Sequence, residues 1–179
     1  MASIELRGAL SLIRPWRQSD AQPLVKHANN LNIARQLRDR FPHPYTLGHA
    51  RQFIRSVAEA RPITMFAIAV NDEAAGGIGF TPGTDVERYS AEIGYWLSEP
   101  FWGRGIVTEA VRLVSDYAFE SCNILRLFAV PFADNAQSTR VLEKAGYALE
   151  ATLRASSVKN GEPRDQTLYA LVNDKWRRP

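Results

Sequence analysis

Two glycines, Gly103 and Gly105, stand just before an amphipathic stretch of this chain. Residues 90–97 are rich in β-branched and aromatic side chains and are predicted to form a strand before them. Apolar residues recur at helical spacing from Val107 to Ala118 after them. Glycine permits unusual backbone dihedrals and lets a ligand approach the main chain, while the first turn of a helix adds free N–H donors and a positive dipole end. The turn is therefore predicted to hold a phosphate group.

Other phosphate-binding loops fit this turn badly. A dinucleotide-binding fingerprint needs a third glycine where Thr108 stands, and an acidic residue roughly 20 residues further on. A Walker-type loop needs a Gly-Lys-Ser/Thr sequence, which does not follow. A diphosphate held mainly by main-chain amides remains, with the structural alternative that the glycines only relieve a tight turn.

The strand before the turn carries a second feature of chemical interest. Glu92, Gly94 and Trp96 share one of its faces, because side chains alternate along a strand. A glycine inside a strand indicates a bulge or a close approach by a ligand, and Pro131 removes a ladder donor at the end of the next strand. These two neighbouring strands are therefore predicted to splay apart and to leave main-chain donors free for an extended ligand.

The elements that must position these residues form one α+β domain over residues 1–179. Thr46 is predicted to cap a helix, prolines keep residues 41–45 extended, and Asn160-Gly161 signals a terminal hairpin. The predicted order is strand 4–14, helices 19–29, 32–38 and 46–61, a meander of strands 65–70, 75–80 and 90–97, helix 107–118, strand 125–130, helix 135–145, and strands 147–158 and 166–172.

Composition excludes several functional classes. The net charge is only +3 and no block of like charges occurs, so no direct nucleic-acid partner is expected. Cys122 is the single cysteine, which excludes an internal disulfide and fits a reducing compartment. No signal peptide and no run long enough to span a bilayer is evident, so we expect a cytoplasmic protein without a membrane partner. The three histidines lack ligand spacing, and no metal is expected.

The order of elements resembles the GNAT superfamily of acetyl-CoA-dependent N-acetyltransferases, and more narrowly its branch that acetylates the N-termini of ribosomal proteins. The similar blocks are Phe41–Thr46, Glu92–Leu97, Trp102–Ala110, Asp134–Tyr147, and a tail from Asn160 through Asp165 to Trp176. This resemblance implies a GNAT-like, mixed but mostly antiparallel central sheet of about seven strands, with helices on both faces and a splayed central strand pair. It also implies acetyl-CoA as the acetyl donor, a primary amine as the acceptor, and no metal.

The resemblance also assigns the cofactor-binding residues. The coenzyme A pyrophosphate would lie on the glycine turn, although Pro100 stands where the family has glutamine or arginine. The pantetheine arm would pair with the splayed strand, and Asn135 matches an asparagine on the pantetheine side. The implied contacts are Tyr95, Trp96, Leu97, Trp102, Gly103, Arg104, Gly105, Ile106, Val107, Thr108, Asn135 and Ser138.

The catalytic residues depart from the commonest family pattern. Leu142 stands where many members have a tyrosine that protonates the leaving thiolate, and the ribosomal-protein branch offers Ser138 instead. Pro131 occupies the position of a cysteine found in one member type, which excludes a cysteine base. Glu92 is the predicted base for the amine, with main-chain N–H groups of residues 93–95 as oxyanion donors. The structural alternatives are a solvated or ion-paired Glu92 and a Ser138 on the wet face of its helix.

The acceptor is the least defined part of the prediction. His43, Tyr45 and Asp165 lie in segments that the resemblance places on the substrate side, although a structural role for His43 and a hairpin cap for Asp165 are alternatives. We expect direct acetyl transfer to an α-amine of a peptide N-terminus or to a small amine, by a monomer or homodimer. The alternative function is a non-catalytic regulatory module that binds coenzyme A with the same fold.

Overall fold

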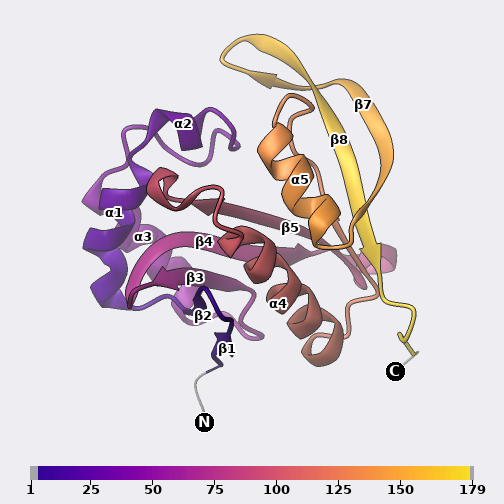
Figure 1. Cartoon of the computed structure of the whole chain (residues 1–179), viewed down its shortest axis with the longest axis horizontal. Helices are drawn as coiled ribbons and strands as arrows, with labels where there is room; N and C mark the ends of the chain where they lie inside the picture. Colours follow the sequence, from indigo (N-terminus) through magenta and orange to yellow (C-terminus); the bar gives the residue numbers. More distant parts are fainter. Residues whose placement is uncertain (1–3, 178–179) are drawn as a thin grey trace.

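The computed structural model describes residues 4–177. Its centre is a mixed sheet (Figure 1). Its strand order is β1-β2-β3-β4-β5-β6-β8-β7, and every neighbouring pair is antiparallel except β5 with β6. The strands are β1 (Leu6–Arg7), β2 (Leu12–Pro15), β3 (Met65–Val70), β4 (Glu73–Pro82), β5 (Ser90–Leu97), β6 (Arg126–Ala129), β7 (Ala148–Lys159) and β8 (Glu162–Val172). The helices are α1 (Ala21–Ala28), α2 (Leu31–Ala34), α3 (Leu47–Ala58), α4 (Ile106–Ser121) and α5 (Ala136–Lys144). The predicted α+β class is confirmed.

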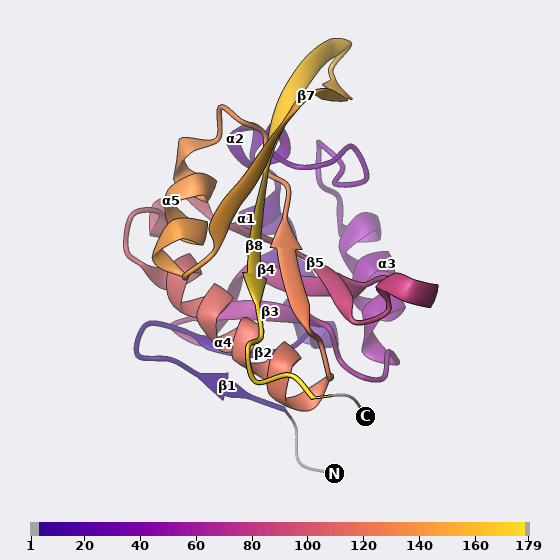
Figure 2. The same ribbon diagram turned by 90° about the vertical axis from the view of Figure 1, so that its right-hand side faces the viewer.

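Helices cover both faces of the sheet, as predicted (Figures 1 and 2). Alternation along β3 explains how one strand serves two cores, since Phe66 and Ile68 pack in the core beneath α4 while Ala67 packs in the core beneath α1 and α3. Thr46 caps α3 by accepting the amide of His49 at 3.3 Å, as predicted.

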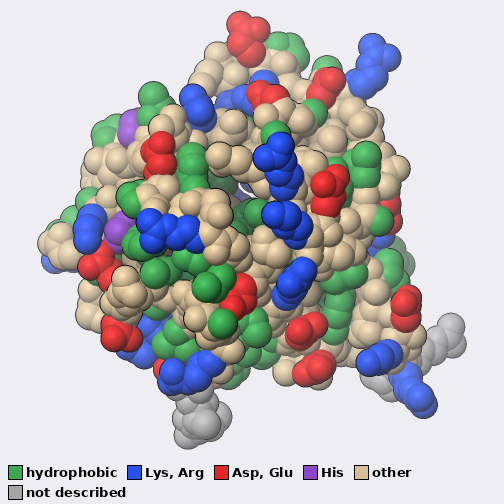
Figure 3. All heavy atoms as spheres, in the orientation of Figure 1, with side chains coloured by type: hydrophobic (Ala, Val, Ile, Leu, Met, Phe, Trp, Pro, Cys, Tyr) green, Lys and Arg blue, Asp and Glu red, His purple; other side chains and the backbone are tan. Residues whose placement is uncertain are grey.

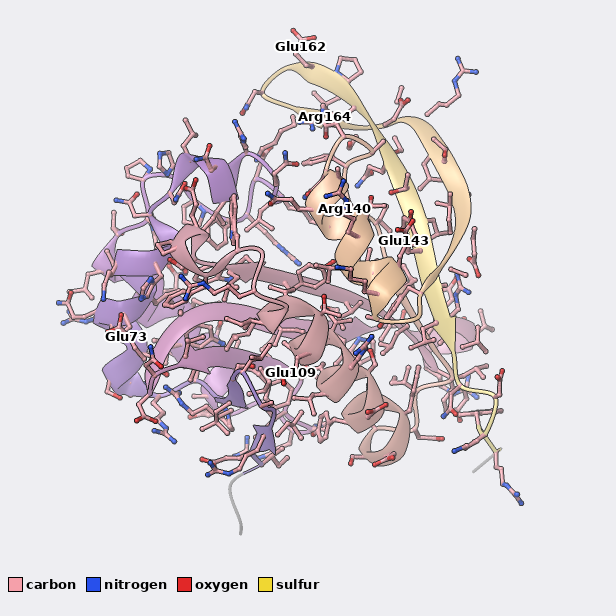
Figure 4. The ribbon with its side chains drawn as sticks, viewed as in Figure 1. Glu73, Glu109, Arg140, Glu143, Glu162 and Arg164 are labelled. Carbon is pink, nitrogen blue, oxygen red and sulfur yellow. The ribbon has the colours of Figure 1, made fainter. Side chains whose placement is uncertain are left out.

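The sheet has eight strands where about seven were expected, because the segment predicted as one strand over residues 4–14 folds back on itself. The amide of Gly8 donates to the carbonyl of Ser11, and Leu10 lies in the turn with 48% of its surface exposed. The Glu109 carboxylate on α4 accepts the amides of Ala9 at 2.7 Å and Leu10 at 3.1 Å (Figure 4). These amides would otherwise lack a protein partner, so a residue far along the chain fixes this turn.

The predicted splay between β5 and β6 is confirmed. The two strands pair only at Ser90–Arg126, Ala91–Leu127 and Glu92–Phe128, and β6 ends at Ala129. Beyond Glu92, the edge of β5 that faces β6 has no strand partner. The sheet therefore opens at its centre, at the end where β5 leads into the glycine turn.

The terminal hairpin of β7 and β8 rises beyond the rest of the molecule (Figures 1 and 2). Asn160 and Gly161 form its turn with φ angles of 53° and 84°, which confirms the hairpin signal. The Lys159 ammonium at its tip bonds the Asp39 carboxylate at 2.6 Å, so the hairpin reaches the loop between α2 and α3.

Candidate active site

A cavity of about 540 Å³ occupies the opening between β5 and β6. Four segments line it: the α2 region with the loop after it, the splayed part of β5, the glycine turn with the start of α4, and the end of β6 with α5. Figure 3 shows a hollow in this face of the molecule, with lysine and arginine side chains gathered beside it. The two groups of residues that the sequence singled out, the glycine turn and the splayed strand, thus line one site.

The glycine turn adopts the backbone that its sequence predicts. Gly103 and Gly105 have φ angles of 73° and 81°, in the left-handed region that other residues adopt at a cost. Gly105 is the N-cap of α4, so the free amides of the first helical turn begin directly after it. The indole N–H of Trp102 donates to the carbonyl of Leu97 at 2.7 Å and holds the turn against the end of β5. All predicted residues from Trp102 to Thr108 line the cavity.

The splayed strand forms one wall of the cavity. Gly94, Tyr95, Trp96 and Leu97 line it from β5. A Cβ added at Gly94 would meet no atom within 4 Å, so the space over this residue is open. An extended chain that lies here can use the main-chain groups that β6 leaves unpaired.

The N-terminus of α5 supplies the opposite wall. The Asn135 side chain caps the helix by accepting the amide of Ser138 at 3.1 Å. The Ser138 hydroxyl lies 2.8 Å from the Tyr95 hydroxyl, a contact that sequence periodicity cannot reveal. Burial raises the pKa of Tyr95 well above its usual range, so this phenol stays protonated at neutral pH. Both hydroxyls lie at a helix N-terminus, where the dipole favours negative charge.

Glu92 lies at the other end of the site, with the loop after α2. Its carboxylate forms an ion pair with the Arg38 guanidinium, so the ion-paired alternative for Glu92 holds in this structure. Phe41 packs edge-on against Trp96 with 5.7 Å between ring centroids and fixes the loop to β5. Gln36 and Arg38 line the cavity beside Glu92, and nothing in their local sequence identified them.

Three cations line the cavity near the glycine turn: Arg104, Arg140 and Lys144. Arg140 and Lys144 lie on α5, where Figure 4 shows Arg140 on the side of the helix toward the hollow. Together with the left-handed glycines and the helix start, they form a cradle suited to several phosphates. The cradle is continuous with the open space beside residues 94–97 of β5, which is called the seam below. The donor set therefore fits a long ligand with phosphates at one end and an extended arm, as coenzyme A has.

Other predicted residues lie outside this lining. Leu142 is fully buried in the core and cannot supply an acid. Tyr45 is 6% exposed and packs against Phe41 in the core beneath α1 and α3, where burial raises its pKa to about 12. His43 lies exposed in the loop before it. The Asp165 carboxylate accepts the amide of Ala155 at 2.7 Å, which supports the hairpin-cap alternative.

Within residues 4–177, no group of three or more histidine, cysteine, aspartate or glutamate side chains is placed to hold a metal ion. In the same residues, no helix combines the length and apolar character needed to cross a membrane.

The opened mixed sheet and its phosphate cradle define an acyl-CoA-dependent transferase, and comparison with known proteins identifies the family. A model of the acetyltransferase (GNAT) domain matches residues 11–148, and the chain belongs to this family. It is an acetyltransferase with acetyl-CoA as donor, which confirms the family and activity predicted from the sequence.

Two sequence relatives agree with this assignment, and a solved structure shares the fold. The probable N-acetyltransferase YjcK of Bacillus subtilis is 30% identical over 182 residues, which cover 94% of this chain and 97% of that protein. The ribosomal-protein-serine acetyltransferase of Escherichia coli is 34% identical over 110 residues, which cover 62% of this chain and 61% of that protein. The solved structure of RimL, a ribosomal L7/L12 α-N-protein acetyltransferase in complex with coenzyme A, has a TM-score of 0.84 at 22% identity and covers 96% of this chain and 99% of that one.

Proposed function

We propose that residues 1–179 form a single N-acetyltransferase domain that acetylates the α-amine of a peptide or protein N-terminus. The observation that carries this proposal is the continuous cavity from the glycine turn, along the seam beside β5, to Glu92, the one carboxylate that lines it among residues 4–177. The donor's diphosphate would lie on residues 102–108 and its extended arm along residues 95–97. A cytoplasmic location and a monomeric or homodimeric state belong to the same proposal.

The chemistry at the Glu92 end is a direct transfer. Glu92, directly or through a water, takes a proton from the acceptor ammonium, and the neutral amine then attacks the thioester carbonyl. Main-chain N–H groups of residues 93–95 would stabilise the oxyanion that develops. As the new C–N bond forms and the C–S bond breaks, the amine's second proton is released and the sulfur leaves as a thiolate, which takes up one proton. The balance is one amide, one thiol and one proton passed to solvent.

Ser138 is proposed to stabilise and protonate that thiolate. Its hydroxyl lies in the first turn of α5, where the helix dipole favours the negative sulfur. The protonated Tyr95 hydroxyl, 2.8 Å away, can donate to the Ser138 oxygen when the serine proton moves to sulfur. Many members of the family have a tyrosine at the position of Leu142 to protonate the thiolate. In the proposed mechanism, Tyr95 supplies an aromatic hydroxyl in its place.

The preference for α-amines follows from the fraction of each kind of amine that is already uncharged near neutral pH. A peptide N-terminus has a pKa of about 7.7–8.0, whereas a lysine side chain has one near 10.4. At neutral pH roughly a tenth of an α-amine is already uncharged, against less than about 0.1% of a lysine. An α-amine therefore needs only modest help from a carboxylate to lose its proton.

The test compares one peptide with its N-terminally blocked form in a thiol-release assay. Each peptide carries one internal lysine, so blocking removes only the α-amine. We expect kcat/KM to fall at least about tenfold on blocking, in line with the difference in uncharged amine. Equal values would overturn the α-amine assignment. Binding of acetyl-CoA without thiol release with any amine would instead support the regulatory module.

A further inference from the structure

The loop after α2 places a cation at the Glu92 end of the cavity. This is where the acceptor amine is proposed to bind, and it is called the acceptor end below. Arg38 lines the cavity, and the contact of Phe41 with Trp96 holds its loop in place. The carboxylate next to Arg38 in this loop, Asp39, bonds Lys159 on the terminal hairpin at 2.6 Å. Among residues 4–177, the carboxylate paired with Arg38 is therefore the proposed base, Glu92.

An acceptor ammonium that approaches Glu92 meets this ion pair. The Arg38 guanidinium contacts Oε1 of the Glu92 carboxylate, and both side chains are partly exposed, so the ammonium can bind the same carboxylate beside the guanidinium. Two positive charges then share one carboxylate, and like charges at this separation repel. The balance is restored if the acceptor brings an anion of its own.

We propose that the acceptor of this enzyme carries an anionic group close to its reacting amine, and that Arg38 binds this anion. The inference rests on the transferase function proposed above. Because Arg38 and Glu92 are in contact, the anion lies within a few bonds of the amine. A peptide that begins with aspartate or glutamate satisfies this, and a free amino acid satisfies it through its α-carboxylate.

The experiment uses two pairs of acceptors that differ in one anion. The first pair is a C-terminally amidated peptide that begins with aspartate and the same peptide beginning with asparagine. The second pair is alanine and alaninamide. Thiol release at saturating acetyl-CoA and near-neutral pH gives kcat/KM for each acceptor, and each value is divided by the fraction of uncharged amine calculated from that acceptor's own pKa. For the wild type we expect the anionic member of at least one pair to exceed its neutral partner about tenfold, which equals 1.4 kcal/mol.

Two variants test whether Arg38 is responsible for the preference for the anionic acceptor. Arg38→Gln should bring the ratio within about twofold, since the charge-assisted hydrogen bond to the anion is lost. Arg40→Gln removes the same charge two positions away, from a residue outside the cavity lining, and should keep the wild-type ratio.

The outcomes separate this inference from the peptide assignment. If only alanine and alaninamide react, the peptide assignment fails and the Arg38 ratio still decides the inference. A ratio near one in the wild type, a ratio preserved in Arg38→Gln, or an equal loss for both members would overturn the inference. Added salt gives a test that needs only the wild type, because ionic screening should shrink the ratio; a ratio that ignores salt would also contradict it.

Discussion

Gly94→Ala separates donor binding from folding. The new methyl would meet no protein atom within 4 Å, and the φ angle of Gly94 lies outside the left-handed region, so alanine fits the folded backbone. Replacing glycine at such a compatible position stabilises a protein by about 0.4–1 kcal/mol, because the unfolded chain loses freedom. In a chain of this size each kcal/mol raises Tm by about 2–4 °C. The variant should therefore be no less stable than the wild type.

The same methyl projects into the seam where the donor's arm is proposed to lie. An extra methyl in a filled site costs about 1–3 kcal/mol, which corresponds to a roughly 5- to 150-fold rise in Kd. Titration calorimetry with acetyl-CoA measures this rise, and thermal unfolding measures the stability. Gly48→Ala on α3 is the matched control, since its methyl would have only an ordinary contact of 3.6 Å with Thr46 and lies outside the cavity lining. An unchanged Kd in a stable Gly94→Ala protein would refute the placement of the donor along β5.

Three further predictions address the turn, the acid and the base. Gly105→Glu should abolish acetyl-CoA binding, because it places a side chain and a negative charge at the start of α4; unchanged affinity in calorimetry would put the phosphate site elsewhere. Ser138→Ala should lower kcat by roughly 10²-fold if the hydroxyl serves the thiolate, whereas a rise only in the KM for acetyl-CoA would indicate a binding role. Glu92→Gln should move the acid limb of the pH–rate profile to higher pH, and an unmoved limb would remove Glu92 from the mechanism.

Features that depend on a few consecutive residues were predictable from the sequence. The left-handed turn of Gly103 and Gly105, the Thr46 cap and the Asn160-Gly161 hairpin each follow from local backbone preferences. The splay of β5 from β6 was also predictable, because a glycine in one strand and a proline after the other weaken the ladder between them.

Features that depend on contacts between distant segments were not predictable in the same way. The N-terminal hairpin turn depends on Glu109, whose carboxylate lies about a hundred residues further along the chain. The hydroxyl pair of Tyr95 and Ser138 joins a strand to a helix, and the ion pair of Arg38 with Glu92 joins a loop to a strand. Such pairs have no sequence period, so a single sequence does not reveal them, and they make up most of the acceptor end of the site.

The most direct measurement of the central claim uses a single peptide that offers both a free α-amine and an internal lysine. The peptide is incubated with acetyl-CoA and the enzyme near neutral pH, and fragmentation mass spectrometry locates the acetyl group in the first product formed. Acetyl on the N-terminal nitrogen, with one thiol released per acetyl group, is the expected result. Acetyl on the lysine, or thiol release without an acetylated peptide, would contradict an α-amine acetyltransferase.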